Sequence, residues 1–173
     1  MAGGYQIKNI ATVLQTVEVL NDETRFKISE AMLREGLENV KSLTRFMGRW
    51  QIISKDPLVL VESAHNEGGM TLAMQQLNTL IINHLHIVFG VVRDKDISKI
   101  LALLPTNATY YFAKANIPRG LEAETLKEQA SAHNLNGKAY PSVSRALSAA
   151  KRRAKSGDLV YVGGSMFVIA EVI

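Results

Sequence analysis

The sequence has 173 residues and contains no cysteine. This absence excludes a disulfide scaffold, a cysteine-ligated zinc site and a catalytic thiolate. The chain also lacks an apolar run near the ~18 residues that a membrane-spanning helix requires. Its start, MAGGYQIKN, has neither the basic stretch nor the apolar core of a secretory signal. We therefore expect a cytoplasmic protein with no membrane partner.

Charge of one sign is also scarce, because 20 lysines and arginines against 16 acids give a net charge of only +4. This excess is smaller than that of a typical nucleic-acid binder. The basic cluster from Lys151 to Lys155 falls at the expected carboxyl end of a helix, where cations complement the helix dipole. We predict no nucleic-acid partner and keep binding through this cluster as an alternative.

Three catalytic motifs are missing. The sequence has no G-x-x-x-x-G-K-[ST] phosphate loop, no G-x-G-x-x-G fingerprint after a strand and no G-x-S-x-G nucleophile elbow. The segment Gly137-Lys138-Ala139 lacks both the first glycine and the hydroxyl of a phosphate loop. A self-sufficient kinase, dehydrogenase or hydrolase is therefore hard to build from this chain.

What the sequence does contain begins with helical periodicity over residues 1–47. Apolar residues predict one helix from Ile7 to Leu20, ended by Asn21-Asp22. Ser29 is a suitable N-cap for a second helix. Two such helices cannot bury both of their apolar faces by themselves, so we expect them to pack on the rest of this chain or on a part missing from it.

From residue 48 onward, strand-like and helix-like segments alternate. Continuous apolar runs, such as residues 58–61 and 87–92, are typical of strands buried on both faces. The pattern predicts a Rossmann-like three-layer α/β domain, a mostly parallel sheet with helices on both faces, preceded by the short helical segment. The expected strands are 50–53, 58–61, 87–92, 109–112 and 159–162; the expected helices are 70–81, 97–104, 122–133 and 142–155, with a final apolar segment at 167–172.

Ligands in such folds bind beyond the carboxyl ends of the strands, which directs attention to the loops there. Loop 62–69 is the richest, because Glu62 and His65 precede Gly68-Gly69, where backbone N–H groups can approach an anion. The same residues would also suit a plain polar turn that caps a helix, and spacing alone leaves both interpretations open. Metal ligation is disfavoured because no second carboxylate–histidine pair is present.

Other loops carry weaker candidates. Arg49, beside a glycine, suits bidentate phosphate binding, but it also suits a surface position next to a core Trp50. The segments 93–96, 118–120 and 163–165 suit either ligand contacts or helix caps and turns. Three histidines without a partner at a functional spacing are interpreted as ordinary surface or core residues: His84, His86 and His133.

Six motifs occur in order: Tyr5-Gln6-x-x-Asn9, Gly48-Arg49-Trp50-Gln51, Glu62-Ser63-Ala64-His65-Asn66, Asp94-Lys95-Asp96, Pro118-Arg119 and Gly164-Ser165-x-Phe167. Each is weak alone, but the ordered set resembles the C-terminal part of folylpolyglutamate synthase/dihydrofolate synthase in the Mur ligase superfamily. The resemblance implies that residues 1–47 are a linker plus the helical tail of an ATPase domain missing from this chain. Residues 48–173 would be the glutamate-ligase domain.

The resemblance also implies a reaction and its participants. Ligases of this family use ATP and Mg²⁺ to phosphorylate a folate or dihydropteroate carboxylate, and the amine of L-glutamate then attacks the acyl phosphate. The phosphate loop and the metal ligands would belong to the missing ATPase domain, so this chain is expected to hold no metal by itself. We therefore expect the chain to be inactive alone and to need that domain as its partner.

Residue roles follow from the same resemblance. Asn9 would contact adenine, Arg49 the phosphates and Glu62 the ribose region of the nucleotide. His65 and Lys95 would serve catalysis in the closed site. Two further residues would bind substrate on the glutamate and phosphate side: Arg119 and Ser165.

Two residues depart from the family pattern. Glu62 stands where the family usually has Asp, which moves the carboxylate by about an ångström or more. Ser63 stands where Gly is usual, which closes backbone angles that only glycine adopts easily. We therefore predict either a site with a shifted register or a weakened nucleotide contact. The alternatives at this point are another Mur-type ligase and a stand-alone α/β binding or regulatory module.

Overall fold

The computed structural model describes residues 6–23, 25–93 and 97–173, without the side chain of Lys8. The chain forms two compact units, Met1–Met47 and Gly48–Ile173, which we call the N-terminal and C-terminal units. Within the described residues, no helix combines the length and the apolar character needed to cross a bilayer.

The N-terminal unit consists of α1 (Gln6–Glu23), α2 (Glu30–Glu38) and α3 (Val40–Thr44). The predicted cap of α2 is confirmed, because the Ser29 side chain accepts a hydrogen bond from the Met32 N–H. Helix α1 runs past the predicted end at Asn21. The Asn21 side chain instead bonds both backbone groups of Ile28, which fastens the connection between α1 and α2.

Apolar side chains of the N-terminal unit lie largely in solvent. Neither α2 nor α3, whose residues are all described, contains a buried residue. The helices of this unit thus leave part of their apolar faces uncovered. The exposed large side chains are Ile7, Leu14, Val19, Phe26, Met32, Leu43, Phe46 and Met47.

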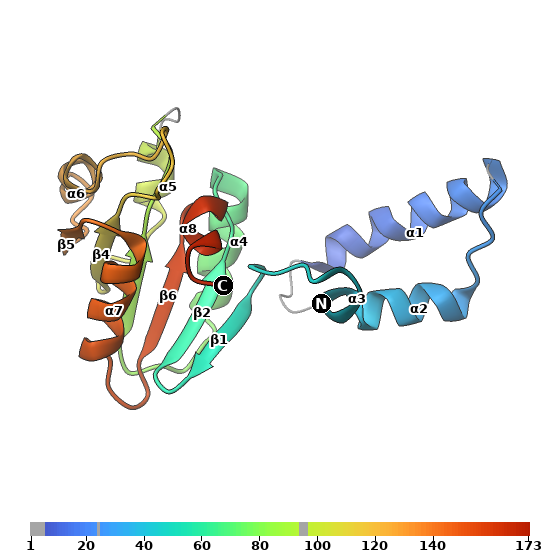
Figure 1. The fold of residues 1–173 in the computed structure, drawn as a ribbon, viewed down its shortest axis with the longest axis horizontal. Coiled ribbons are helices and arrows are strands. Elements are labelled where there is room, and N and C mark those ends of the chain that lie inside the picture. The colour runs from blue at the N-terminus through green and yellow to red at the C-terminus, as the bar shows by residue number, and fades with distance from the viewer. Residues whose placement is uncertain (1–5, 24, 94–96) are drawn as a thin grey trace. The chain divides into compact units, whose positions relative to one another are not determined.

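The C-terminal unit is built on a six-stranded sheet of order β1-β2-β6-β3-β4-β5 (Figure 1). Strand β1 pairs antiparallel with β2, and all other pairings are parallel. The strands are β1 (Gln51–Lys55), β2 (Leu58–Glu62), β3 (Leu85–Phe89), β4 (Thr109–Ala113), β5 (Gly137–Tyr140) and β6 (Leu159–Gly163). The helices are α4 (Glu67–Leu77), α5 (Ser98–Ala102), α6 (Ala123–Ser131), α7 (Val143–Arg153) and α8 (Met166–Ala170).

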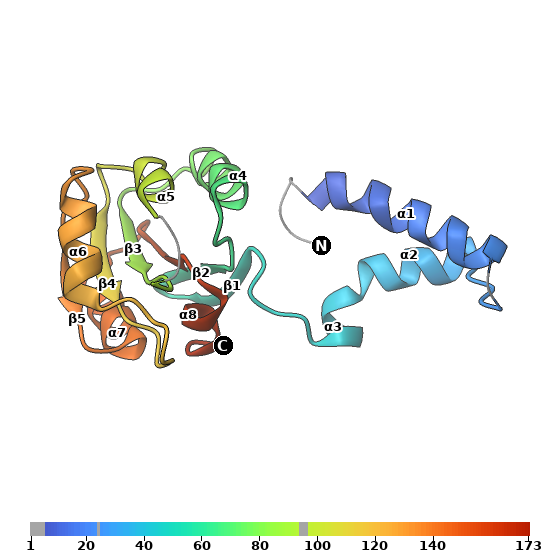
Figure 2. The same ribbon diagram turned by 90° about the horizontal axis from the view of Figure 1, so that it is seen from above.

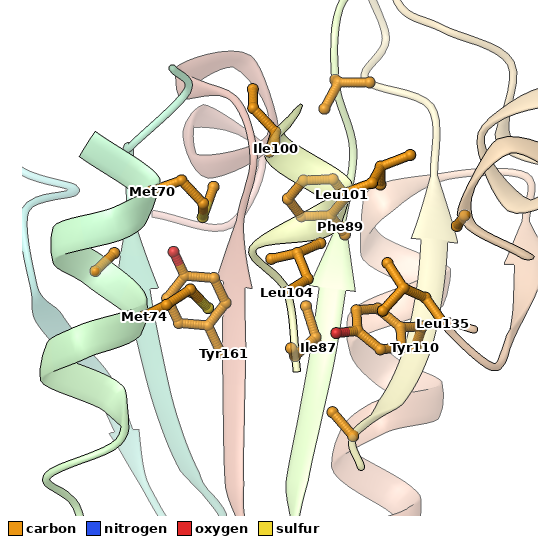
Figure 3. Packing of buried hydrophobic residues seen from close by; sticks show 14 of the residues in the cluster. Met70, Met74, Ile87, Phe89, Ile100, Leu101, Leu104, Tyr110, Leu135 and Tyr161 are labelled. Atoms are coloured by element: carbon orange, nitrogen blue, oxygen red, sulfur yellow. The ribbon is translucent and has the colours of Figure 1, made fainter. Parts of the chain in front are cut away.

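Helices cover both faces of this sheet. Helices α4, α5 and α6 pack on one face, and α7 and α8 pack on the other (Figure 2). Successive side chains of β2 point to opposite faces of the sheet, so that Leu60 belongs to the first core while Val59 and Val61 belong to the second. Both faces are therefore apolar and need covering helices. In the first core, Met70 and Met74 of α4 lie beside Tyr161 of β6 (Figure 3). The predicted three-layer α/β fold is confirmed.

The structure differs from the prediction at β5, α4 and β3. Strand β5 was not predicted, because its four residues are not an apolar run. The residue Gly137 packs so closely that a Cβ there would lie 2.3 Å from the Tyr110 carbonyl oxygen. Helix α4 ends at Leu77, and Ile81, predicted on its apolar face, is fully exposed. Strand β3 ends at Phe89, and Val92 forms an isolated bridge with Gly120.

Candidate active site

A cavity of about 230 Å³ lies beyond the carboxyl ends of the central strands. Its walls come from the loops after β2, β3, β4 and β6, as the position of ligand sites in such sheets predicts. Three predicted site residues line it together: His65, Arg119 and Ser165. The rest of the wall is mainly apolar and includes Val91, Val92, Ile97, Ile100, Met166 and Phe167.

His65 is held at the rim by the turn between β2 and α4. Its Nδ1 lies 3.0 Å from the Ser63 carbonyl oxygen, which fixes the proton on Nδ1 when the ring is neutral. Helix α4 is capped by the neighbouring Asn66, whose side chain accepts a hydrogen bond of 2.8 Å from the Gly69 N–H. Asn66 and not His65 therefore supplies the cap of α4, and the His65 ring lies at the cavity.

Arg119 is positioned by a short ladder between the loops after β3 and β4. The Arg93 N–H donates to the Arg119 carbonyl at 2.9 Å, and the Leu121 N–H donates to the Val91 carbonyl at 2.9 Å. The Arg93 guanidinium also donates to the Pro118 carbonyl. The Arg119 guanidinium carbon then lies 4.9 Å from the centre of the Phe167 ring. This cation–π contact holds the Arg119 guanidinium at the cavity.

Ser165 is buried and begins helix α8. Its Oγ accepts a hydrogen bond of 3.2 Å from the Phe167 N–H. A hydroxyl that accepts in this way can still donate its own proton to a bound group. The preceding Gly164 has φ 94°, and a Cβ there would lie 2.6 Å from the Phe89 ring. The turn that brings Ser165 to the cavity therefore needs glycine.

Arg49 and Glu62 meet at the start of the C-terminal unit. Arg49 Nη1 lies 3.3 Å from Glu62 Oε1, and the Glu62 side chain is only 1% exposed against 35% for Arg49. The Glu62 carboxylate also accepts hydrogen bonds from the backbone N–H groups of Trp50 and Ala64, each at 2.9 Å. A buried carboxylate needs such partners to offset its lost hydration. Neither Arg49 nor Glu62 is among the residues that line the cavity.

Two predicted site residues lie elsewhere. Asn9 is exposed on α1, where its Nδ2 donates to Gln6 Oε1 at 2.7 Å, and it belongs to the N-terminal unit. Lys95 lies outside the described residues, as do its neighbours Asp94 and Asp96. Among the described residues, no group of three or more His, Asp or Glu side chains is arranged to hold a metal.

A buried polar cluster that spacing could not reveal surrounds His86 on β3. His86 Nε2 lies 3.3 Å from Asp158 Oδ2, and Nδ1 lies 3.1 Å from the Tyr111 hydroxyl. Burial lowers the pKa of His86, and the contact with Asp158 only partly opposes this shift. The Lys155 N–H lowers the pKa of Asp158 by donating to its carboxylate. His86 is a core histidine, one of the two placements that the sequence left open, and it has a partner 72 residues away.

Comparison with known proteins places the chain among ligases. Residues 48–166 match the model of the family described as Mur ligase, glutamate ligase domain. A probable bifunctional folylpolyglutamate synthase/dihydropteroate synthase of Haloferax volcanii is 30% identical over 99% of this chain and 20% of its own length. The dihydrofolate synthase/folylpolyglutamate synthase of Escherichia coli K12 is 34% identical over 95% of this chain and 37% of its own length.

Solved structures give the same result. Escherichia coli FolC in complex with DHPP and ADP superposes with a TM-score of 0.77 at 33% identity, over 95% of this chain and 37% of that one. The Yersinia pestis bifunctional enzyme with Mn, AMPPNP and L-glutamate bound has a TM-score of 0.79 at 28% identity, over 96% and 38% of the chains. The chain thus spans well under half the length of these relatives, and it belongs to the Mur ligase family, whose glutamate ligase domain it carries at residues 48–166.

Proposed function

We propose that this chain is the C-terminal, glutamate-binding part of an ATP-dependent ligase that joins L-glutamate to folate or dihydropteroate through an acyl phosphate. The observation that carries the proposal is the cavity in which Arg119, His65 and Ser165 converge beside an apolar wall. The similar proteins are named folylpolyglutamate or dihydrofolate synthases, which favours the folate branch over another Mur-type ligase.

L-Glutamate fits the chemistry of this cavity. Its two methylene groups suit the apolar wall formed by side chains such as Ile97 and Ile100. The Arg119 guanidinium suits one carboxylate, since an arginine fork pairs with carboxylate oxygens. The Ser165 hydroxyl can donate to a second acceptor.

His65 supplies what the reaction needs from a base. The amine of glutamate attacks the carbonyl carbon of the acyl phosphate, a C–N bond forms, and phosphate leaves as the C–O bond breaks. The amine must lose a proton on the way. We assign this role to His65 because its imidazole lies at the cavity beside Arg119 and Ser165.

The nucleotide belongs to the site shared with the rest of the ligase. ATP with Mg²⁺ would supply the phosphoryl group, and the metal ligands are expected in the part of the ligase that precedes this chain. Arg49 fits the nucleotide phosphates because its guanidinium is half-exposed and charged. Asn9 and Lys95 remain proposed contacts to adenine and to the reacting groups.

The N-terminal unit supports the same proposal. Its exposed apolar side chains suit the packing surface of a preceding ATPase domain. The 173-residue chain alone is then expected to show no ATP turnover, because the phosphate loop lies in that domain. Magnesium-dependent ATP hydrolysis by the purified chain would contradict this proposal.

The cavity assignment is tested in the longer ligase. We expect Arg119→Ala to raise the KM for glutamate by about tenfold or more, because it removes a charged carboxylate contact. The KM for ATP should change little. Arg145→Ala, on the exposed face of α7, is the matched control and should leave both constants unchanged. An unchanged glutamate KM in Arg119→Ala would remove this cavity from the glutamate site.

A further inference from the structure

We propose that Glu62 is a positioning residue. Its carboxylate holds Arg49 and the turn at Trp50 in place, so that Arg49 can meet the nucleotide phosphates, and it does not itself contact the ribose. The role in catalysis rests on the proposed function, whereas the coupling of Glu62 to Arg49 is a property of this chain and can be tested alone.

Both oxygens of the Glu62 carboxylate already have protein partners. Oε1 accepts from the Ala64 N–H at 2.9 Å and lies 3.3 Å from Arg49 Nη1, and Oε2 accepts from the Trp50 N–H at 2.9 Å. With 1% of the side chain exposed, both oxygens face protein groups. A ribose hydroxyl would have to displace one of these contacts, whereas Arg49 already bridges the buried acid to the surface.

The second support is the backbone that Glu62 fastens. Gly48 has φ 85° and Trp50 has φ 45°, so the segment that enters the C-terminal unit passes through two left-handed residues. The left-handed region is unfavourable for a tryptophan, and surrounding contacts must hold it there. The Trp50 N–H bond to Glu62 is one such contact, and the Ser63 N–H bond to the Gly48 carbonyl at 2.8 Å is another.

The third support is the length of the glutamate side chain. The Ala64 N–H lies two residues along the chain, within reach of an acid at position 62. Trp50 and Arg49 lie across a separate segment, 12 and 13 residues away in sequence. An aspartate is shorter by one C–C bond of about 1.5 Å. It would keep the local bond to Ala64 and lose the contacts that reach across, so the extra methylene is what links β2 to Arg49.

This link orients Arg49 before any ligand arrives. With Nη1 on Glu62, the guanidinium plane is fixed at one corner, and the half-exposed side chain can present its remaining donors to an anion. An arginine that is already ordered loses less conformational freedom when it binds a phosphate. Glu62 would therefore act on nucleotide affinity through Arg49.

The coupling is tested first in the 173-residue chain by NMR. We expect Glu62→Asp and Glu62→Gln to shift the Arg49 Nε–Hε resonance and to speed hydrogen exchange of the Trp50 amide, while the Ala64 amide stays protected in Glu62→Asp. Glu124→Gln, which neutralises an exposed acid paired with Lys127, is the control and should leave these signals unchanged. Unchanged Arg49 and Trp50 signals in folded Glu62→Asp would overturn the proposal, whether or not the chain is part of a ligase.

The catalytic consequence is tested by a double-mutant cycle in the longer ligase. We expect Glu62→Asp and Arg49→Lys each to raise the KM for ATP about tenfold, and the double variant to be no worse than the poorer single variant. The KM for glutamate should stay within about twofold in all three. Effects on the ATP KM that multiply would show that Glu62 acts independently of Arg49. A wild-type enzyme that shows no ligation would overturn the proposed function and leave the NMR result to decide the coupling.

Discussion

The two units of this chain bury their apolar residues in opposite ways. In the C-terminal unit, both faces of the sheet carry a core, and side chains such as Phe89 and Val162 are completely buried. In the N-terminal unit, residues of the same kind, such as Leu43 and Phe46, are more than half exposed. The C-terminal unit therefore contains a core of its own, whereas α2 and α3 of the N-terminal unit contribute no buried residue.

The largest effect should come from separating the units. We expect residues 48–173 alone to unfold cooperatively, with a Tm within a few degrees of that of the whole chain. Residues 1–47 alone should show non-cooperative helicity confined mainly to α1, which has 18 residues, because α2 and α3 are shorter than the ~12–15 residues below which an isolated helix is marginal. Circular dichroism against temperature measures both. A cooperative transition in the 1–47 peptide would show that the helices need no partner.

A matched pair of leucine truncations sharpens the same contrast. Leu126→Ala on α6 empties a fully buried position and should lower the free energy of unfolding by about 2–5 kcal/mol. Leu43→Ala on α3, where 63% of the side chain is exposed, should change it by no more than about 0.5 kcal/mol. Urea unfolding of the whole chain gives both values. Equal losses in the free energy of unfolding would mean that Leu43 contributes as much to stability as a leucine in the core of the C-terminal unit.

Acid should lower the stability of the C-terminal unit through its buried histidine, His86. The pKa of His86 is lowered by burial, so above about pH 6.5 the ring is neutral in both states and stability is unaffected. As the pH falls below that value, the unfolded chain binds the proton more readily and stability declines. The lowered pKa of Asp158, caused first by the Lys155 N–H bond, adds a stabilising contribution that is lost only below its unfolded pKa near 4.

The measurement is urea unfolding of residues 48–173 between pH 7.5 and 5. We expect a smaller pH dependence in His86→Gln, which keeps a polar side chain but cannot titrate. His133→Gln is the control, because His133 lies in the turn after α6 and its ring makes an exposed contact with Ser98. An identical pH slope in wild type and His86→Gln would show that other groups cause the acid sensitivity.

The sequence predicted this molecule best where local pattern decides structure. Continuous apolar runs marked the strands that are buried on both faces, and β5, which is a half-exposed edge strand, was missed for the same reason. The rule that ligands bind at the carboxyl ends of strands selected the loops of His65, Arg119 and Ser165, which line one cavity. Contacts between segments far apart in the sequence could not be predicted from local pattern. Neither the inward-facing carboxylate of Glu62 nor the partner of His86 follows from spacing, because both contacts depend on how the chain packs.

The smallest expected effect comes from replacing a helix-capping serine by alanine, once in each unit. Ser29 caps α2 in the N-terminal unit, and Ser142 caps α7 in the C-terminal unit, and each side chain accepts a hydrogen bond from a backbone N–H of the first turn. Replacing such a cap by alanine costs about 0.5–2 kcal/mol of helix stability. Because α7 packs on the sheet through buried residues such as Val143 and Ala146, Ser142→Ala should lower the Tm of the whole chain. Ser29→Ala should reduce helicity locally and leave that Tm unchanged, because α2 has no buried residue through which the loss could reach the core. Should Ser29→Ala lower the Tm as much as Ser142→Ala, the two units would unfold as one, and the contrast between them would describe burial but not stability.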